Sequence, residues 1–302
     1  MRKMISLLSN STTYQNIFIS NIRSDNMNVD KKGNVYWLIA IEGLDCSGKE
    51  TFAKQLKKFM EANINKTNPD RNSNEDKKSI KVHLVSFPDY TIESGKELKE
   101  LLKLDPKKRD QDKLTALFAK NRKDVLDNLD AAKYNIVIFD RFIMSNIIYG
   151  MLPVMLQNGM ARSYASDTQF YNLLKAGIKE MDDLDIWSMD RTVIFSRFGS
   201  KAVARKHDQL LEAKQDKDAN ENPSTQACLS SIIDMYVNEK TIEDICLQHN
   251  DVDAYYDSSR IFQAGDYDRT NIKIGFTFNR TRCLEFMADI FYYIKLYLEC
   301  FD

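Results

Sequence analysis

Short apolar runs alternate along this chain with longer segments in which apolar residues recur at helical spacing. The runs, which are typical of buried strands, cover residues 35–41, 80–87, 134–139, 192–195 and 272–278. After the first run, Phe52, Leu56 and Phe59 place apolar side chains on one face of a predicted helix. Two further predicted helices carry such a face, formed by Leu114, Leu117, Phe118, Val125 and Leu129 in one and by Cys283, Phe286, Ile290, Ile294 and Leu298 in the other.

This alternation predicts parallel strands joined by helical crossovers, and hence a three-layer α/β fold with a parallel central sheet flanked by helices. In sheets of this kind, ligands bind beyond the carboxyl ends of the strands. Gly43, Phe87 and Asp140 lie at or just after the ends of the first three runs, so we expect them to meet at one edge of the sheet. The sequence therefore places a candidate site there.

Composition narrows the classes of protein that this chain can represent. Its 302 residues are 43% hydrophobic, which is enough for one large core or for two smaller ones. A formal net charge of -1 argues against a protein built to coat nucleic acid or an anionic membrane, and no apolar run is long enough to span a membrane. The cysteines form no C-x-x-C pair, which favours a reducing compartment. We therefore expect a cytoplasmic protein without a nucleic-acid or membrane partner.

Two polar segments interrupt the pattern. Residues 1–34 are rich in Ser, Thr and Asn and contain no acid before Asp25, which predicts a disordered extension, with a weak targeting sequence as the alternative. Residues 63–79 form a second polar stretch and are predicted to be a surface loop. We therefore expect the folded domain to cover residues 35–302.

The segment that follows the first run has the pattern of a phosphate-binding loop. Gly43 and Gly48 stand five residues apart, and Lys49 follows directly. Glycines let backbone N–H groups point into one concavity, the helix N-terminus adds positive potential, and the lysine supplies a mobile charge for the β- and γ-phosphates. The residues predicted to bind the ATP phosphates are Gly43, Cys46, Ser47, Gly48, Lys49, Glu50 and Thr51.

Glu50 departs from this pattern, because the residue after the lysine is usually a Ser or Thr whose hydroxyl binds Mg²⁺. Thr51 comes one position later, about 100° further round the helix. The Glu50 carboxylate either faces solvent and stabilises the positive end of the helix, or faces the phosphates through Mg²⁺. We predict the solvent-facing arrangement.

Two further pairs of residues have chemistry suited to a nucleotide. Asp140 and Arg141 follow an apolar run, where an aspartate can hold Mg²⁺ or its water and an arginine can bind a second phosphate; a solvent-exposed ion pair is the alternative. Phe118 and Arg122 are four apart on a predicted helix, so a ring that can stack on a base lies beside a guanidinium that can read its edge. The alternative is a core phenylalanine beside a solvated arginine.

Four motifs, in their order along the chain, resemble those of the thymidylate kinases. They are Ile41-Glu42-Gly43-Leu44-Asp45-Cys46-Ser47-Gly48-Lys49, Phe87-Pro88-Asp89-Tyr90, Phe118-Ala119-Lys120-Asn121-Arg122 and Asp140-Arg141-Phe142-Ile143-Met144-Ser145-Asn146-Ile147-Ile148-Tyr149. The resemblance runs from about residue 35 to about residue 236. It implies a P-loop kinase fold, transfer of the γ-phosphoryl group of ATP to thymidine monophosphate (dTMP), dependence on Mg²⁺ and commonly a homodimer.

The resemblance also implies how the acceptor nucleoside is bound. Phe118 would stack on thymine, Arg122 would hydrogen-bond its edge, and Asn146 would help to fix the base. Tyr149 would crowd the 2′ position, so that deoxyribose fits better than ribose.

For the phosphates, the resemblance implies that Tyr90 and Arg141 hold the acceptor phosphate. Residues 213–223 would form a lid over the site, in which Lys217 approaches the transferred group. The implied catalytic residues are Asp45, Lys49, Arg141 and Lys217. The implied Mg²⁺ ligands are Asp45, Asp140 and Glu221.

The chain differs from the family at several points, and these differences leave alternatives open. Cys46 replaces an arginine that some members carry in the loop, so positive charge must come from the lid. Residues 241–269 have no family counterpart. The alternatives to a thymidylate kinase are a kinase for another deoxynucleotide or deoxynucleoside, or a nucleotide-binding protein without catalysis.

Overall fold

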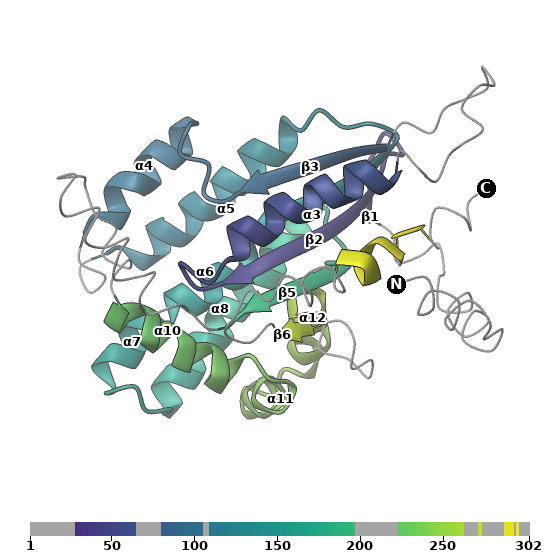
Figure 1. Cartoon of the computed structure of the whole chain (residues 1–302). Coiled ribbons are helices and arrows are strands. Elements are labelled where there is room, and N and C mark those ends of the chain that lie inside the picture. The colour runs from purple at the N-terminus through teal and green to yellow at the C-terminus, as the bar shows by residue number, and fades with distance from the viewer. Residues whose placement is uncertain are drawn as a thin grey trace, which may run out of the picture.

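A central parallel sheet organises the residues described by the computed structural model, which are 28–64, 80–104, 109–196, 223–262, 271–273, 287–292 and 294–295. The main path across this sheet runs β3-β4-β2-β5-β6 (Figure 1). These strands are β2 (Val35–Gly43), β3 (Ile80–Ser86), β4 (Tyr134–Asp140), β5 (Arg191–Phe195) and β6 (Asn271–Lys273). Each pair of neighbours on the path is parallel, which confirms the predicted topology.

The register of the strands brings their carboxyl ends together. Asp140 pairs with Ile41 on one side and with Ser86 on the other. Beyond the strands, the backbone N–H of Phe87 donates to the carbonyl of Asp140 at 3.0 Å, and that of Arg141 donates to Ile41 at 2.9 Å. The predicted meeting of Gly43, Phe87 and Asp140 at one edge is therefore confirmed.

Helices cover both faces of the sheet (Figure 1). On one face, Trp37, Ile39 and Ile41 of β2 pack against α3 (Lys49–Ile64) and against Met287, Ile290 and Ile294. On the other face, Leu38 and Ala40 pack into the core that contains α6 (Ile143–Gly150), α8 (Tyr164–Asp183) and α10 (Pro223–Tyr236). Because strand side chains alternate between faces, the unbroken apolar run of β2 serves both cores. Of the predicted C-terminal face, Cys283, Phe286 and Leu298 lie outside the described residues.

A further pair of helices extends the fold beside this sheet. In α5 (Gln111–Asp127), Leu114 and Leu117 pack against Leu98 and Leu102 of α4 (Glu93–Leu102). Val125 and Leu129, which we placed on the same face, pack instead against the main core, and Leu129 lies beyond the end of the helix. The α5 helix is thus fixed at both ends, and the Phe118–Arg122 segment lies between them.

The end of the polar extension differs from expectation. Residues 28–34 belong to the folded domain, because β1 (Asn28–Val29) pairs antiparallel with the start of β2. The Asp30 carboxylate accepts hydrogen bonds from Lys32, Asn34 and Tyr36 and so closes the turn between the strands. Composition alone did not predict this strand, because a polar segment can pair at an edge through its backbone.

Residues 241–269, for which the sequence offered no counterpart, include most of α11 (Glu239–Gln248) and all of α12 (Val252–Phe262). Both helices join the core that contains α8, through Ile242, Ile245, Ile261 and Phe262. The short helix α7 (Leu152–Gln157) lies between α6 and α8 in the chain. The predicted strand 272–278 begins as expected, whereas residues 274–278 and the lid at 213–222 lie outside the described ranges. Within those ranges, no helix has the length and apolarity to cross a lipid bilayer.

Candidate functional site

The phosphate loop curls over the end of β5. Gly43 has φ +129°, and a Cβ built on it would lie 2.2 Å from the carbonyl oxygen of Phe195. The N–H of Leu44 donates to that same oxygen at 3.1 Å, while the Ser47 hydroxyl donates to the carbonyl of Leu44 at 2.7 Å. Gly48 also has positive φ. The two glycines predicted from spacing therefore occupy backbone conformations that favour glycine.

Lys49 opens α3 and lies between two carboxylates. Its side chain is buried, and its Nζ is 3.7 Å from Oδ1 of Asp45 and 4.0 Å from Oδ1 of Asp140. Burial raises the pKa of Asp140, against the opposing effect of the positive charges of Lys49 and Arg141. The lysine ammonium is thus held at the junction of the loop and β4, which is where the sequence pattern predicted a charge for phosphates.

Arg141 connects β4 to the phosphate loop. Its Nη1 donates to the carbonyl of Gly43 at 3.0 Å, and its Nη2 donates to the Asp45 carboxylate. Its guanidinium carbon lies 5.1 Å from the ring centroid of Tyr149, whose hydroxyl is 3.4 Å from Oδ2 of Asp45. Three residues predicted for the site, Asp45, Arg141 and Tyr149, therefore form one contiguous network.

Gln226 completes this network and was missed by the sequence analysis. Its fully buried side chain accepts from the backbone N–H of Asp45 at 2.9 Å and donates to Oδ2 of that residue at 3.2 Å. It comes from α10, 181 positions along the chain from Asp45. A single glutamine carries no local pattern that could have identified it.

Glu42 is a second residue that the sequence analysis did not assign. It is buried at the end of β2 and accepts hydrogen bonds from the backbone N–H of Phe142 at 3.0 Å and from the hydroxyl of Ser145. Burial raises the pKa of the Glu42 carboxyl. The carboxylate caps the first turn of α6 and so ties that helix to the strand that precedes the phosphate loop.

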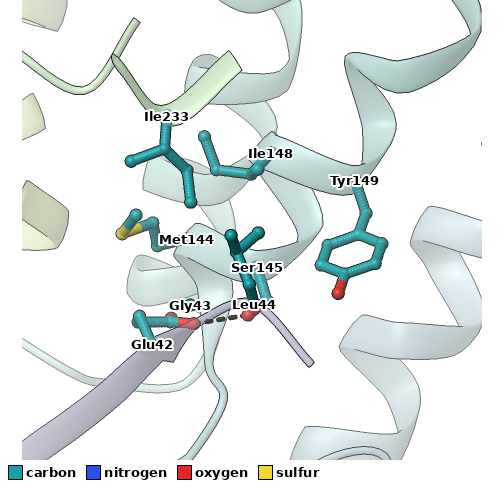
Figure 2. A pocket seen from close by; sticks show the side chains of 8 residues that line it. All are labelled: Glu42, Gly43, Leu44, Met144, Ser145, Ile148, Tyr149 and Ile233. Carbon is teal, nitrogen blue, oxygen red and sulfur yellow. Dashed lines mark hydrogen bonds between the residues drawn. The ribbon is translucent and has the colours of Figure 1, made fainter. Parts of the chain in front are cut away.

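The pocket in Figure 2 lies beside this contact. It is lined by Glu42, Gly43, Leu44, Met144, Ser145, Ile148, Tyr149 and Ile233. Figure 2 shows Glu42 and Ser145 joined by their hydrogen bond, with the Tyr149 ring turned away to one side. Its volume of about 10 Å³ is close to that of a single water molecule, which is far too small for a nucleotide. This void is a packing detail beneath the site and does not bind the substrate.

Asp140 and Asp45 are the described members of the predicted metal set. Oδ1 of Asp140 is buried and finds no hydrogen-bond partner in the described part of the chain. Glu221 and the lid residue Lys217 lie outside the described residues. In the described ranges, no three His, Cys, Asp or Glu side chains gather as a metal site.

On the acceptor side, Asn121 connects two of the family motifs. Its Oδ1 accepts from the backbone N–H of Asp89 at 2.8 Å, and its Nδ2 donates to the Asp89 carbonyl at 3.0 Å. These bonds fix the Phe87–Tyr90 loop to α5, so that Tyr90 and Phe118 are carried by linked segments. The side chain of Tyr90 is exposed, while that of Phe118 is half-buried.

Arg122 is buried, so the alternative of a solvated arginine is wrong. Its side chain is 1% exposed and forms a two-point ion pair with Glu180 of α8, in which Nη2 donates to Oε2 at 2.8 Å. Its guanidinium carbon lies 6.0 Å from the ring centroid of Phe118 and 5.8 Å from that of Phe142. Asn146 stands about one helical turn after Phe142, and its buried Nδ2 finds no hydrogen-bond partner among the described residues.

Glu50 is exposed and forms an ion pair with Lys54 one turn along α3, as the solvent-facing prediction requires. Thr51 is exposed as well. By contrast, the ammonium group of Lys49 turns inward toward Asp45 and Asp140.

Residues 74–164 match the thymidylate kinase family model. The chain is 32% identical over 116 residues to protein 251L of Invertebrate iridescent virus 6, which carries a thymidylate kinase name; the alignment covers 38% of this chain and 47% of that protein. The chain thus spans about half the length of this curated relative. A solved thymidylate kinase from Candida albicans aligns over 86% of this chain and 91% of its own, with a TM-score of 0.45 and 17% identity.

The strand order, the parallel pairing and the glycine loop between β2 and α3 define a P-loop kinase fold. The matched segment contains three of the four motifs quoted above, from Phe87 to Tyr149. Over residues 74–164, the chain is similar to the thymidylate kinase family.

Proposed function

We propose that this protein is a thymidylate kinase, which transfers the γ-phosphoryl group of ATP to dTMP and yields thymidine diphosphate and ADP. The observation that carries the proposal is the contact between Arg141 and the phosphate loop, in which the guanidinium donates to the Gly43 carbonyl at 3.0 Å. A phosphate bound by the loop and an acceptor phosphate bound by Arg141 would therefore be neighbours. The match of residues 74–164 to the thymidylate kinase family model supports the same activity.

The reaction needs no general base, because the attacking group is already a phosphate oxyanion. The new bond forms to the γ-phosphorus as its bond to the bridging oxygen of ADP breaks, and no proton moves. What the protein must supply is alignment and charge. Lys49 would contact the β- and γ-phosphates from its position beside Asp45 and Asp140, while Arg141 would hold the acceptor phosphate.

Asp140 fits a residue that holds hydrated Mg²⁺, because its buried Oδ1 lacks a hydrogen-bond partner among the described residues. Bound Mg²⁺ would neutralise charge on the phosphate oxygens. Asp45 has less capacity for a metal, since its carboxylate pairs with Arg141 and Lys49. We assign Asp45 chiefly to orienting Arg141 at the acceptor side.

For the acceptor, we propose that Phe118 stacks on the base while Arg122 and Asn146 donate to its edge, and that Tyr90 contacts the acceptor phosphate. The orphaned Nδ2 of Asn146 supports a donor role. We also propose that the protein is a homodimer, which light scattering of the purified chain tests directly.

A coupled assay of ADP release tests the activity. The purified chain is incubated with ATP, Mg²⁺ and each of dTMP, dUMP, dCMP, dAMP, dGMP and thymidine. Fastest turnover with dTMP is expected. Faster turnover with another acceptor would instead identify a kinase for that compound, and nucleotide binding without turnover would identify a protein that binds nucleotides without catalysis.

Tyr149→Ala is expected to weaken discrimination between dTMP and its ribose counterpart. The ring packs beside the Arg141 guanidinium, and its removal opens space for a 2′-hydroxyl. A change of one small group in such a pocket shifts specificity by about 1–3 kcal/mol. The ratio of the two kcat/KM values measures the effect, and Tyr149→Phe, which keeps the ring, should retain the wild-type ratio. Equal ratios in wild type and Tyr149→Ala contradict the role.

Glu50→Ser is expected to keep activity within about tenfold of wild type, a change of about 1.4 kcal/mol or less in the barrier. The reason is that the Glu50 carboxylate pairs with Lys54 at the surface. Steady-state kcat with ATP and dTMP is the measurement. A collapse of kcat would make Glu50 a metal ligand, and a much larger rise would mean that the natural loop is catalytically impaired.

A further inference from the structure

The buried pair between Arg122 and Glu180 joins α5 to α8. Arg122 lies on α5 and Glu180 lies 58 positions away, in the last turn of α8. Both side chains are buried, at 1% and 9% exposure. The two bonds use Nε and Nη2 of the guanidinium, so Nη1 lies outside the pair.

Stability alone does not account for this arrangement. Taking both charges out of water opposes their attraction, so a buried ion pair is often no more stabilising than apolar side chains of similar volume. Glu180 also stands in the last turn of its helix, where the macrodipole disfavours a negative charge. The ion pair therefore indicates that the guanidinium of Arg122 has to be held in one position.

The surroundings of Arg122 indicate what a fixed guanidinium is for. The aromatic rings of Phe118 and Phe142 lie 6.0 and 5.8 Å from its central carbon. Asn146, about one turn after Phe142, carries a buried Nδ2 without a hydrogen-bond partner in the described ranges. The Arg122 guanidinium thus lies close to Phe118, a half-buried aromatic ring that can stack on a base.

We propose that Glu180 is a positioning residue that makes this site selective for pyrimidines with a 4-oxo group over those with a 4-amino group. The proposal rests on the proposed function, in that Arg122 contacts the base. An arginine can only donate hydrogen bonds, so it matches a carbonyl oxygen and opposes an amino group. A mobile arginine can turn away from an amino group. Two hydrogen bonds to Glu180 hold Arg122 in one orientation. Its donors therefore stay in place and oppose the amino group of a 4-amino pyrimidine.

The test is equilibrium binding by calorimetry of dTMP, dUMP and dCMP to the full chain and to Glu180→Gln. The wild-type protein is expected to prefer dTMP and dUMP, both of which carry a 4-oxo group, over dCMP. In Glu180→Gln, the ratio of dTMP to dCMP affinity should fall by about tenfold or more, which is the range for one hydrogen bond to a charged group. The ratio of dTMP to dUMP affinity and the affinity for ATP should stay as in the wild type.

Asp183→Asn is the matched control, because Asp183 lies on the same helix but forms an exposed ion pair with Lys179. It should leave every ratio unchanged. Thermal unfolding of each variant is measured in parallel. If Glu180→Gln does not fold, Glu180→Asp replaces it, since the shorter side chain keeps the charge but cannot maintain the same two-point contact; the dTMP to dCMP ratio should then fall as well.

Three results would overturn the proposal. One is a dTMP to dCMP ratio that is unchanged in the folded variant, which would leave Glu180 with a purely structural role. Another is an equal loss of affinity for all three nucleotides, and the third is a wild-type protein that binds dCMP as tightly as dTMP. Because binding requires no turnover, a protein that binds dTMP selectively but does not phosphorylate it would refute the proposed function alone.

Discussion

Replacing Lys49 by alanine is expected to reduce kcat by about a hundredfold or more. Removing one preorganised donor from a developing charge typically costs about 10²–10³ in kcat. Lys49 is the loop residue whose charge lies between Asp45 and Asp140, at 3.7 and 4.0 Å. The apolar side chains beneath the loop do not depend on it, since β2 packs through Ile39 and Ile41.

The measurement is ADP release at saturating ATP and dTMP, together with thermal unfolding of the same preparations. Lys54→Ala is the matched control, because Lys54 lies on the same helix but pairs at the surface with Glu50. This control should retain wild-type turnover. Should Lys49→Ala fail to fold, Lys49→Met keeps the length and apolar stem of the side chain and tests the same charge. Wild-type turnover in a folded Lys49 variant would refute the assignment of the phosphate site.

Gly43→Ala is expected to destabilise the protein by about 2–6 kcal/mol. Two effects add at this position. The backbone has φ +129°, a region in which a side chain costs about 1–3 kcal/mol. A Cβ would also lie 2.2 Å from the carbonyl oxygen of Phe195, so the loop or β5 must move, and overpacking of this kind costs about 1–3 kcal/mol.

Gly159→Ala separates the two effects. Gly159 also has positive φ, at +60°, but nothing lies within 4 Å of the added Cβ. The Gly159→Ala substitution should therefore lower the free energy of unfolding by the backbone cost alone, about 1–2 kcal/mol. Denaturant unfolding of both variants gives the difference in free energy. A Gly43→Ala variant no less stable than Gly159→Ala would contradict the close approach of the loop to β5.

The strands and the phosphate loop were predictable because their signals are local. The β2 strand is an unbroken apolar run, and such a run can satisfy both faces of a central strand only when helices cover each side. The loop needs two glycines and a lysine within seven positions, and the structure gives both glycines positive φ and turns the lysine inward. The solvent-facing position of Glu50 also followed from local reasoning, because its charge suits the start of a helix.

The contacts that organise the candidate site were not predictable in this way. Gln226 reaches Asp45 across 181 positions, and Glu42 reaches Ser145 across 103. A side chain that hydrogen-bonds to a distant segment produces no periodic pattern in the sequence around it. Such residues are therefore indistinguishable in sequence from ordinary polar positions on a helix or at the end of a strand.

The sequence by itself determined the parallel sheet, the phosphate loop and the resemblance to the thymidylate kinases, because each depends on residues close together in the chain or on motifs in a fixed order. The tertiary structure decided the state of Arg122. Its position four residues after Phe118 indicated a shared helix face, whereas its burial and its pairing with Glu180 depend on how α5 and α8 pack. The same holds for β1, which joins the sheet through backbone hydrogen bonds that the side-chain pattern does not predict.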